Sequence, residues 1–309
     1  MKMELSSSLL NKRALSLLIF MVSIFFAVDL QASKLELIKE KSFQVKSGGE
    51  LQVEASGADV KIMSWDKEEV HVKIFGNERA REKMRFEIEQ TENGVRVLVK
   101  KRSSWSFFEW GGYDVKIEAM VPKNYNPDIT TSGGDISVYS LTGRFELKTS
   151  GGDVSSKDTN GELMVRTSGG DITLTNHNGN SDISTSGGDI RTIKMNGNLR
   201  ASTSGGDVDV DCSNGKVSVG TSGGDVTVSY SGDSRGIKAT TSGGDIRIKV
   251  PADIKAKVDL ETHGGEIDCN FNNSKNSKVK RGEFHAEFNG GGELLYCSTS
   301  GGDIIITEK

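Results

Sequence analysis

The sequence predicts an all-β protein: a single-stranded β-solenoid (a β-helix or β-roll) with 18-residue coils and a looser β cap at its N-terminal end. Three observations lead to this fold class. The hexapeptide TSGGDI or TSGGDV occurs eight times in 309 residues. Pairs of apolar residues recur between the copies, and glycine-containing turn signals separate these pairs.

The threonine that opens each copy sets the period of the repeat. Successive threonines are 18 residues apart five times and then 20 apart. A fixed period of this length is typical of a solenoid, and it is too short for a propeller blade, which needs about 40 residues. The first seven copies open at Thr131, Thr149, Thr167, Thr185, Thr203, Thr221 and Thr241.

The apolar residues indicate two strands in each coil. With the threonine as repeat position 0, positions 5 and 7 are apolar or small, and so are positions 14 and 16. In the first copy these residues are Ile136, Val138, Phe145 and Leu147. A spacing of two marks a strand with one buried face. Equivalent strands of neighbouring coils should stack about 4.8 Å apart, with the threonines in an inward-facing row.

Two kinds of turn signal separate the strands. Gly-Gly occupies positions 2 and 3, and Asn-Gly or Thr-Gly occupies positions 11 and 12. We expect the glycines at both corners to adopt positive φ, where a Cβ atom would clash. A left-handed hexapeptide helix is the alternative, because 18 is three times six. It requires an apolar residue every six, whereas the apolar pairs here recur every nine, so we expect two main faces and a right-handed coil.

The chain divides into three predicted regions. Residues 1–32 resemble a signal peptide, in which Lys12 and Arg13 precede an apolar run that is short for a span of about 20 residues. A membrane anchor is the alternative. Residues 33–125 form an N-terminal β region that caps the solenoid, and residues 126–309 form the TSGGD-repeat solenoid. The protein should therefore be exported to the periplasm, the cell surface or the medium.

Both ends of the solenoid depart from the repeat. In the N-terminal region, residues 55–60 resemble a degraded copy and residues 78–85 suggest one or two helical turns. In the C-terminal region, Thr262–Ile267 is a worn copy, followed by a polar loop insertion near 272–282. A final strand pair should then close the stack, since terminal repeats are commonly atypical.

An aromatic stretch in the N-terminal region is the best candidate for a contact site. It has two interpretations: an exposed tip that meets a partner or a lipid surface, or a loop folded back over the end of the solenoid. Its residues are Trp105, Phe107, Phe108, Trp110 and Tyr113.

The repeated aspartates raise the question of metal binding. Neighbours stacked about 4.8 Å apart repel by about 1 kcal/mol in water, so the row must be solvated, bonded to turn N–H groups or bridged by cations. The calcium-solenoid signature carries a third glycine that is missing here. We favour a structural row of turn-capping aspartates, with a calcium-binding repeat as the alternative. The row is Asp135, Asp153, Asp171, Asp189, Asp207, Asp225 and Asp245.

The sequence offers little for catalysis, and we assign no catalytic or metal-binding residue and no cofactor. Residues 220–224 match the G-x-S-x-G elbow, but the strand–turn–helix setting is missing. The four histidines occupy unrelated repeat positions. A polysaccharide-acting enzyme would need particular acids gathered on one face, and it remains an alternative.

Charge and cysteine content narrow the function further. The net charge of −4 argues against a nucleic-acid binder, which would show a basic face.

Cys269 and Cys297 fall at inward-facing positions and are expected to be buried thiols. A disulfide between them is left open, since spacing alone does not decide it.

The chain resembles the bacterial putative-adhesin family, a domain of unknown function. The matching features are the eight TSGGD copies, the Trp65-Asp66 segment, the Val121-Pro122 junction and the closing Gly290–Gly292 with Thr299–Ile304. The resemblance covers about residues 40 to 307. It implies a β-solenoid at the cell envelope and supplies no catalytic residues. We therefore expect an exported, non-enzymatic adhesin-like scaffold or binding protein. Its partner should be an envelope protein or a glycan, and the mature chain should have no transmembrane span.

Overall fold

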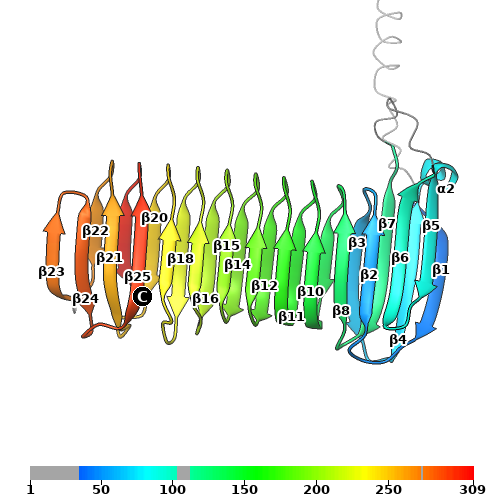
Figure 1. The fold of residues 1–309 in the computed structure, drawn as a ribbon, viewed down its shortest axis with the longest axis horizontal. Coiled ribbons are helices and arrows are strands. Elements are labelled where there is room, and N and C mark those ends of the chain that lie inside the picture. The colour runs from blue at the N-terminus through cyan, green and yellow to red at the C-terminus, as the bar shows by residue number, and fades with distance from the viewer. Residues whose placement is uncertain (1–34, 103–111, 273) are drawn as a thin grey trace, which may run out of the picture. The chain divides into compact units, whose positions relative to one another are not determined.

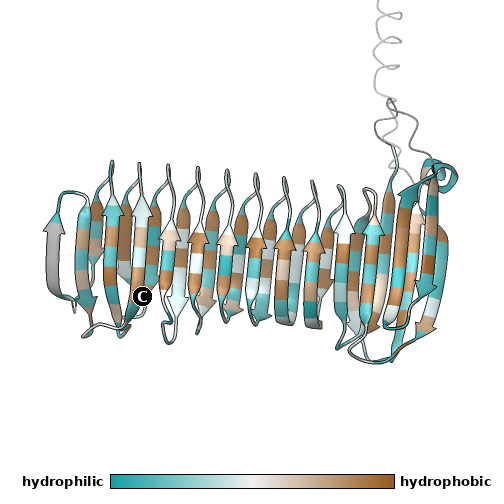
Figure 2. Cartoon of the chain, in the orientation of Figure 1, coloured by the Kyte–Doolittle hydropathy of each residue, from teal (hydrophilic) through white to brown (hydrophobic). Residues whose placement is uncertain are grey.

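The computed structural model describes residues 35–102, 112–272 and 274–309. Leu35–Lys309 form one compact unit built almost entirely of strands (Figure 1). This is the all-β solenoid that the repeat predicts, and apolar residues alternate with polar ones along its strands (Figure 2). Within the described ranges, no helix has the length and apolar character that a membrane crossing requires. The predicted signal peptide, residues 1–32, lies outside them.

Each coil places one strand on each of two opposite faces. Within a face, strands pair in parallel with an 18-residue offset, so Val154 lies beside Ile172 and Leu163 beside Ser181. The offset becomes 20 where β17 pairs with β19 and β18 with β20. Strand β11 runs through a corner and belongs to both faces. The first face contains β9 (Ile136–Tyr139), β11 (Val154–Arg166), β12 (Ile172–Asn178), β14 (Ile190–Asn196), β16 (Val208–Ser213), β18 (Val226–Ser231) and β20 (Ile246–Val250). The second face contains β8 (Asn126–Thr131), β10 (Thr142–Lys148), the end of β11, β13 (Ser181–Ser184), β15 (Leu199–Ser202), β17 (Val217–Gly220) and β19 (Ile237–Thr240).

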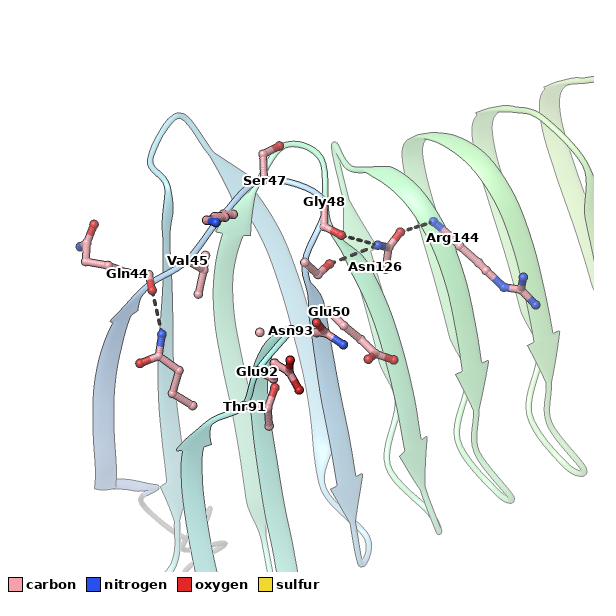
Figure 3. A pocket seen from close by; sticks show the side chains of 14 residues that line it. Gln44, Val45, Ser47, Gly48, Glu50, Thr91, Glu92, Asn93, Asn126 and Arg144 are labelled. Carbon is pink, nitrogen blue, oxygen red and sulfur yellow. Dashed lines mark hydrogen bonds between the residues drawn. The ribbon is translucent and has the colours of Figure 1, made fainter.

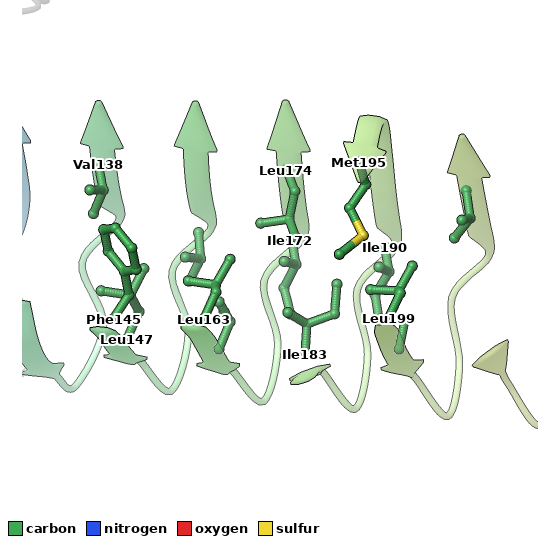
Figure 4. Close-up of a cluster of buried hydrophobic side chains, with 14 of the residues drawn as sticks. Val138, Phe145, Leu147, Leu163, Ile172, Leu174, Ile183, Ile190, Met195 and Leu199 are labelled. Atoms are coloured by element: carbon green, nitrogen blue, oxygen red, sulfur yellow. The ribbon is translucent and has the colours of Figure 1, made fainter. Parts of the chain in front are cut away.

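The core lies between the two faces. Ile172 and Leu174 point inward from the first face, and Leu163 and Ile183 point inward from the second (Figure 4). All four are at most 3% exposed. Each such side chain contributes about 1.5–3 kcal/mol by leaving water. A slip of one residue would turn these side chains outward, so burial selects the 18-residue register.

The TSGGD corner joins the second face of one coil to the first face of the next. The Thr149 hydroxyl donates to the carbonyl of Gly134 in the preceding coil (2.9 Å) and accepts the N–H of Gly152 (3.3 Å). A Cβ atom on Gly152 would lie 2.1 Å from the Gly134 carbonyl oxygen. The expected positive φ is wrong at this corner, because neither Gly134 nor Gly152 adopts it. The second glycine is required because the coils approach closely.

Positive φ occurs at the opposite corner, as predicted. Gly161 and Gly179 have φ of 129° and 141°. Two residues with side chains also adopt the left-handed conformation there, namely Asp158 (φ 55°) and Asn176 (φ 54°). Aspartate and asparagine tolerate this conformation better than most residues.

The N-terminal region contains two further coils and an antiparallel cap. Strands β2 (Glu50–Ala55) and β3 (Asp59–Trp65) pair in parallel with β8 and β9, and β6 (Gly94–Lys101) and β7 (Val115–Pro122) pair with β2 and β3. The antiparallel strands β1 (Glu36–Gln44), β4 (Glu69–Gly76) and β5 (Met84–Gln90) lie outside them. The predicted helical turn is α2 (Glu78–Lys83), whose first turn is capped by Asn77.

The C-terminal coils are not stacked in chain order. Strands β25 (Glu293–Thr299) and β26 (Ile304–Glu308) pair with β19 and β20, and β21 (Ala256–Thr262) and β22 (Ile267–Asn270) lie outside them. The expectation that the last strand pair closes the stack is therefore wrong. The segment expected as a polar loop contains β23 (Ser274–Lys280), which forms a hairpin with β24 (Glu283–Phe288). This hairpin pairs with β21 and covers its edge.

The three cysteines are free thiols. Cys212 and Cys297 are buried, and Cys269 is partly exposed on β22. Burial raises the pKa of the Cys212 and Cys269 thiols to about 12. Cys297 is buried as predicted, whereas Cys269 is only partly buried. A raised pKa keeps these thiols largely protonated at neutral pH, but Cys269 can still be reached from solvent.

Candidate functional site

Two cavities open on the second face beside the corner opposite TSGGD, and Arg144 lines both of them. The first cavity has a volume of about 1010 Å³ and lies at the N-terminal end. The second has a volume of about 590 Å³ and crosses the strands from β10 to β17. We call these two cavities together the trench. Its length follows the stacking direction of the coils, which suits an elongated ligand.

Two parallel rows of outward side chains form the walls of the second cavity. Their spacing within a row is the strand spacing, about 4.8 Å, and the rows stand about 7 Å apart because they are two positions apart along each strand. The floor between them is strand backbone, since the intervening residues Phe145, Leu163 and Leu199 point into the core. The first row is Arg144, Glu162, Asn180, Asn198 and Lys216, and the second is Met164, Asp182, Arg200 and Ser218.

Hydrogen bonds hold the first row in order. The Asn198 side-chain Nδ2 atom donates to the side-chain Oδ1 atom of Asn180 (3.0 Å). The Oδ1 atom of Asn198 in turn accepts the backbone N–H of Lys216 (2.8 Å). Such links pre-orient the amides and reduce the entropy that binding would cost.

The trench carries charges of both signs. In the first row, Arg144 lies 3.8 Å from Glu162. In the second row, Asp182 is held by Arg166 at 3.0 Å. Exposed pairs of this kind contribute little to stability. Because the signs alternate, the trench does not present the continuous positive surface that a polyanion would need.

Asn126 shapes the first cavity (Figure 3). Its side-chain amide donates to the carbonyl of Gly48 (2.9 Å) and accepts the backbone N–H of Arg144 (2.9 Å). On the far side, Gln90 donates to the carbonyl of Gln44 (2.9 Å). These bonds hold the β1–β2 loop against β8 and β10. The cavity wall is therefore pre-formed.

Tyr125 lies beneath this cavity and is fully buried. A Cβ atom on Gly94 would lie 2.6 Å from the Tyr125 hydroxyl, and one on Gly49 would lie 2.8 Å from its ring. Both glycines line the cavity and pack directly against the Tyr125 side chain, which therefore fixes their position. Burial raises the pKa of Tyr125 to about 12, which keeps the phenol neutral.

The aspartate row lies at the TSGGD corner, away from the trench. Each carboxylate accepts the backbone N–H of the next aspartate, as Asp135 does from Asp153 (2.9 Å). This is the bonding that the turn-capping interpretation expects. Near the C-terminal end, the Arg247 guanidinium bridges Asp225 (3.0 Å) and Asp245 (2.6 Å). In the described part of the chain, no group of three or more metal-ligating side chains comes together.

The aromatic contact site is only partly described. Trp105, Phe107, Phe108 and Trp110 lie outside the described residues. Tyr113 packs against the core. Arg79 and Lys101 lie over its ring, 5.1 Å and 5.3 Å from the ring centroid.

Sequence reasoning did not find the trench. Its walls are repeat positions 13 and 15, which vary from copy to copy and carry no periodic signal. The mixture of asparagine, acid and base at position 13 was the one available indication, because a purely solvated face has no need for amides that bond to one another.

The Toastrack DUF4097 family model matches residues 49–307. A putative adhesin from Bacteroides fragilis is 14% identical over 89% of this chain and 98% of its own, with a TM-score of 0.43. A putative lipid binding protein from Parabacteroides distasonis is 15% identical over 87% of this chain and 96% of its own, with a TM-score of 0.41. A putative cell adhesion protein from Clostridium sporogenes is 14% identical over 89% of this chain and 100% of its own, with a TM-score of 0.26.

No curated protein matches the chain. The family match begins just before the first N-terminal coil and ends within the last strand, so it includes every TSGGD copy and both rows of the second cavity. The chain belongs to the Toastrack DUF4097 family.

Proposed function

We propose that the protein is an exported, non-enzymatic binding scaffold that holds a linear glycan along the trench. The observation that carries this proposal is that Arg144 lines both cavities, so that the two lie next to each other along several coils. Each coil would add a few weak hydrogen bonds in register. Many such contacts on a rigid support give useful affinity without a deep pocket.

The chemistry of the walls favours a glycan over the other partners considered. Amide, carboxylate and guanidinium groups hydrogen-bond hydroxyl groups, and Met164 offers an apolar contact for a sugar face. Export through the predicted signal peptide would place the trench where envelope glycans occur.

Binding to soluble linear glycans, measured by calorimetry, tests this proposal. The trench variant carries Asn180→Ala, Asn198→Ala and Arg200→Ala. The control variant carries Thr173→Ala, Arg191→Ala and Asp209→Ala, which lie on the first face of the same two coils and the next one. At about 1 kcal/mol for each lost hydrogen bond, the trench variant should bind at least tenfold more weakly. Equal affinity in both variants would refute the trench as the site.

The aromatic stretch remains a second proposed contact. Replacement of Trp105, Phe107, Phe108 and Trp110 by alanine should weaken attachment to intact envelope and leave binding to soluble glycans unchanged. A loss of soluble glycan binding in this variant alone would move the site from the trench to the aromatic stretch.

One observation favours a polysaccharide-cleaving enzyme as the second candidate. Asp128 and Glu146 are register neighbours on β8 and β10 and line a separate cavity of about 440 Å³. Burial and the neighbouring Glu146 raise the pKa of Asp128, whereas a hydrogen bond from Lys148 lowers the pKa of Glu146. Retaining glycosidases use an acid and an ionised carboxylate about 5 Å apart. Glycan release that Asp128→Asn abolishes would establish this function instead.

A further inference from the structure

The C-terminal end of the solenoid is uneven. On the first face, β26 is followed by β22, which has no further strand partner among the described residues. On the second face, β25 is followed by β21, β24 and β23. The second face is therefore two strands longer, and the β23–β24 hairpin extends beyond β22 (Figure 1).

The apolar residues at this end are incompletely covered. Ile267 and Cys269 on β22 are partly exposed, whereas their neighbours on β26, Ile304 and Ile306, are fully buried. Phe284 on β24 is also partly exposed. On β24, Ala286 and Phe288 are buried, and the ring of Phe271 stacks on Phe288 at 3.8 Å. Among the described side chains, the core thus continues, on the second face, beyond the level of β21 and β22 into β24.

The two open edges carry opposite charges. Asp268 on β22 is exposed, and Glu266 directly precedes the strand. Lys275 and Lys280 on β23 are exposed. Like edges therefore repel, whereas β22 of one molecule and β23 of another attract each other.

The N-terminal end is closed by contrast. There the first face is longer, and β1 reaches across to the edge of β5. The Lys39 ammonium donates to the carbonyl of Phe86 (2.8 Å) and the Lys41 ammonium to that of Ile88 (3.0 Å). In the described residues, no side chain covers the C-terminal edge strands in a comparable way. The two ends of the solenoid therefore differ: the longer face closes over the shorter one at the N-terminal end and not at the C-terminal end.

We propose that two copies of this protein join tail to tail through a lap joint at their C-terminal ends. A two-fold axis parallel to the strands places the hairpin of each copy in the two-strand gap of the other. Strand β22 then pairs antiparallel with β23 of the second copy, and the reverse pair forms by symmetry. Both faces continue without a step, and Ile267, Cys269 and Phe284 become part of one shared core.

The mass of the full-length protein, measured by sedimentation equilibrium, tests the joint. The wild type should be a dimer at micromolar concentration. Asp268→Lys sets a lysine against the basic edge of the second copy and should weaken dimerisation at least tenfold. Asp209→Lys is the matched control, because Asp209 has the same repeat position in the middle of the stack, and it should remain dimeric.

A rescue experiment separates edge pairing from misfolding. Lys275→Glu with Lys280→Glu should also give monomers, and combining these changes with Asp268→Lys should restore the dimer. Labelling of Cys269 by maleimide should be slower in the dimer than in the Asp268→Lys monomer. A monomeric wild type, an unaffected Asp268→Lys variant or a failed rescue would each overturn the proposal. None of these outcomes bears on glycan binding in the trench.

Discussion

The carboxylate of Asp153 accepts the backbone N–H of Asp171, its counterpart one coil later, at 2.8 Å. The same bond links Asp171 to Asp189 at 2.8 Å. Each aspartate thus satisfies a corner N–H group that has no strand partner. The row is a backbone cap repeated along the solenoid, and the hydrogen bonds offset the repulsion between neighbouring carboxylates.

Replacement of one aspartate should show which property of the side chain matters. Asp171→Ala removes the acceptor for the Asp189 N–H and should lower the free energy of unfolding by about 1–2 kcal/mol. Asp171→Asn keeps an acceptor and removes two like-charge contacts, so its stability should be close to that of the wild type. Urea unfolding measures both. A larger loss for Asp171→Asn than for Asp171→Ala would show that the charge itself is required.

The two glycines of a single corner should respond very differently to alanine. A Cβ atom on Gly152 would lie 2.1 Å from a carbonyl oxygen of the preceding coil, whereas on Gly151 the nearest atom would be 3.9 Å away. Gly152→Ala should therefore cost about 3 kcal/mol or more through strain. Gly151→Ala should be neutral or stabilise slightly by restricting the unfolded chain.

Thermal or urea unfolding of these two variants is a direct comparison, because the residues are adjacent and equally frequent in the repeat. Equal losses would show that the close approach of the coils is not what selects glycine. Nothing in the structure explains why the first glycine, Gly151, recurs.

The period of 18 predicted the two faces, the inward threonines and the aspartate row because every internal coil has the same neighbours. A residue such as Thr149 therefore repeats its contacts wherever it recurs. The end coils have different neighbours. The order in which their strands stack depends on which strand pairs with the exposed edge of the last regular coil, and the repeat does not encode this. The positions of β22 and β26 could therefore not be predicted. The trench was missed for a related reason. Asn180 and Arg200 face outward, where stacking imposes no common residue type.

Stability should fall between about pH 6.5 and pH 4 because of His177. This residue is 1% exposed, and its Nδ1 atom lies 2.9 Å from the Thr159 hydroxyl. Burial lowers the pKa of His177 from 6.5 to about 4, opposed by the Gly161 carbonyl. The unfolded chain thus binds a proton in this window that the folded chain does not, which favours unfolding as the pH falls.

The full effect of His177 is about 3 kcal/mol and is complete below pH 4. His177→Met should remove this contribution, and methionine suits the site because Met195 is buried at the same repeat position one coil later. The measurement is the urea midpoint at several pH values. An unchanged slope in His177→Met would assign the acid sensitivity to other groups.

A second contribution should appear at lower pH. The Asp245 backbone N–H, with help from Arg247, lowers the pKa of the Asp225 carboxyl. A group with a lowered folded-state pKa stabilises the fold above its unfolded value of about 3.8, and the stabilisation is lost as the pH falls through the folded value. Asp225→Asn should therefore flatten the stability curve below about pH 4 without changing it near pH 6. A flattening near pH 6 would contradict this assignment.

The lysines of β1 should keep the N-terminal end from associating. Lys39 and Lys41 cover carbonyl groups on the edge of β5, and edge strands with free polar groups tend to pair with other chains. In a background of Asp268→Lys, which opens the C-terminal joint, Lys39→Met with Lys41→Met should produce new oligomers in light scattering. Lys61→Met, on the outer surface of β3, is the control and should not. If the double variant stays monomeric at high concentration, the lysines contribute only to local stability, because the edge of β5 would then be blocked by the shape of the cap itself.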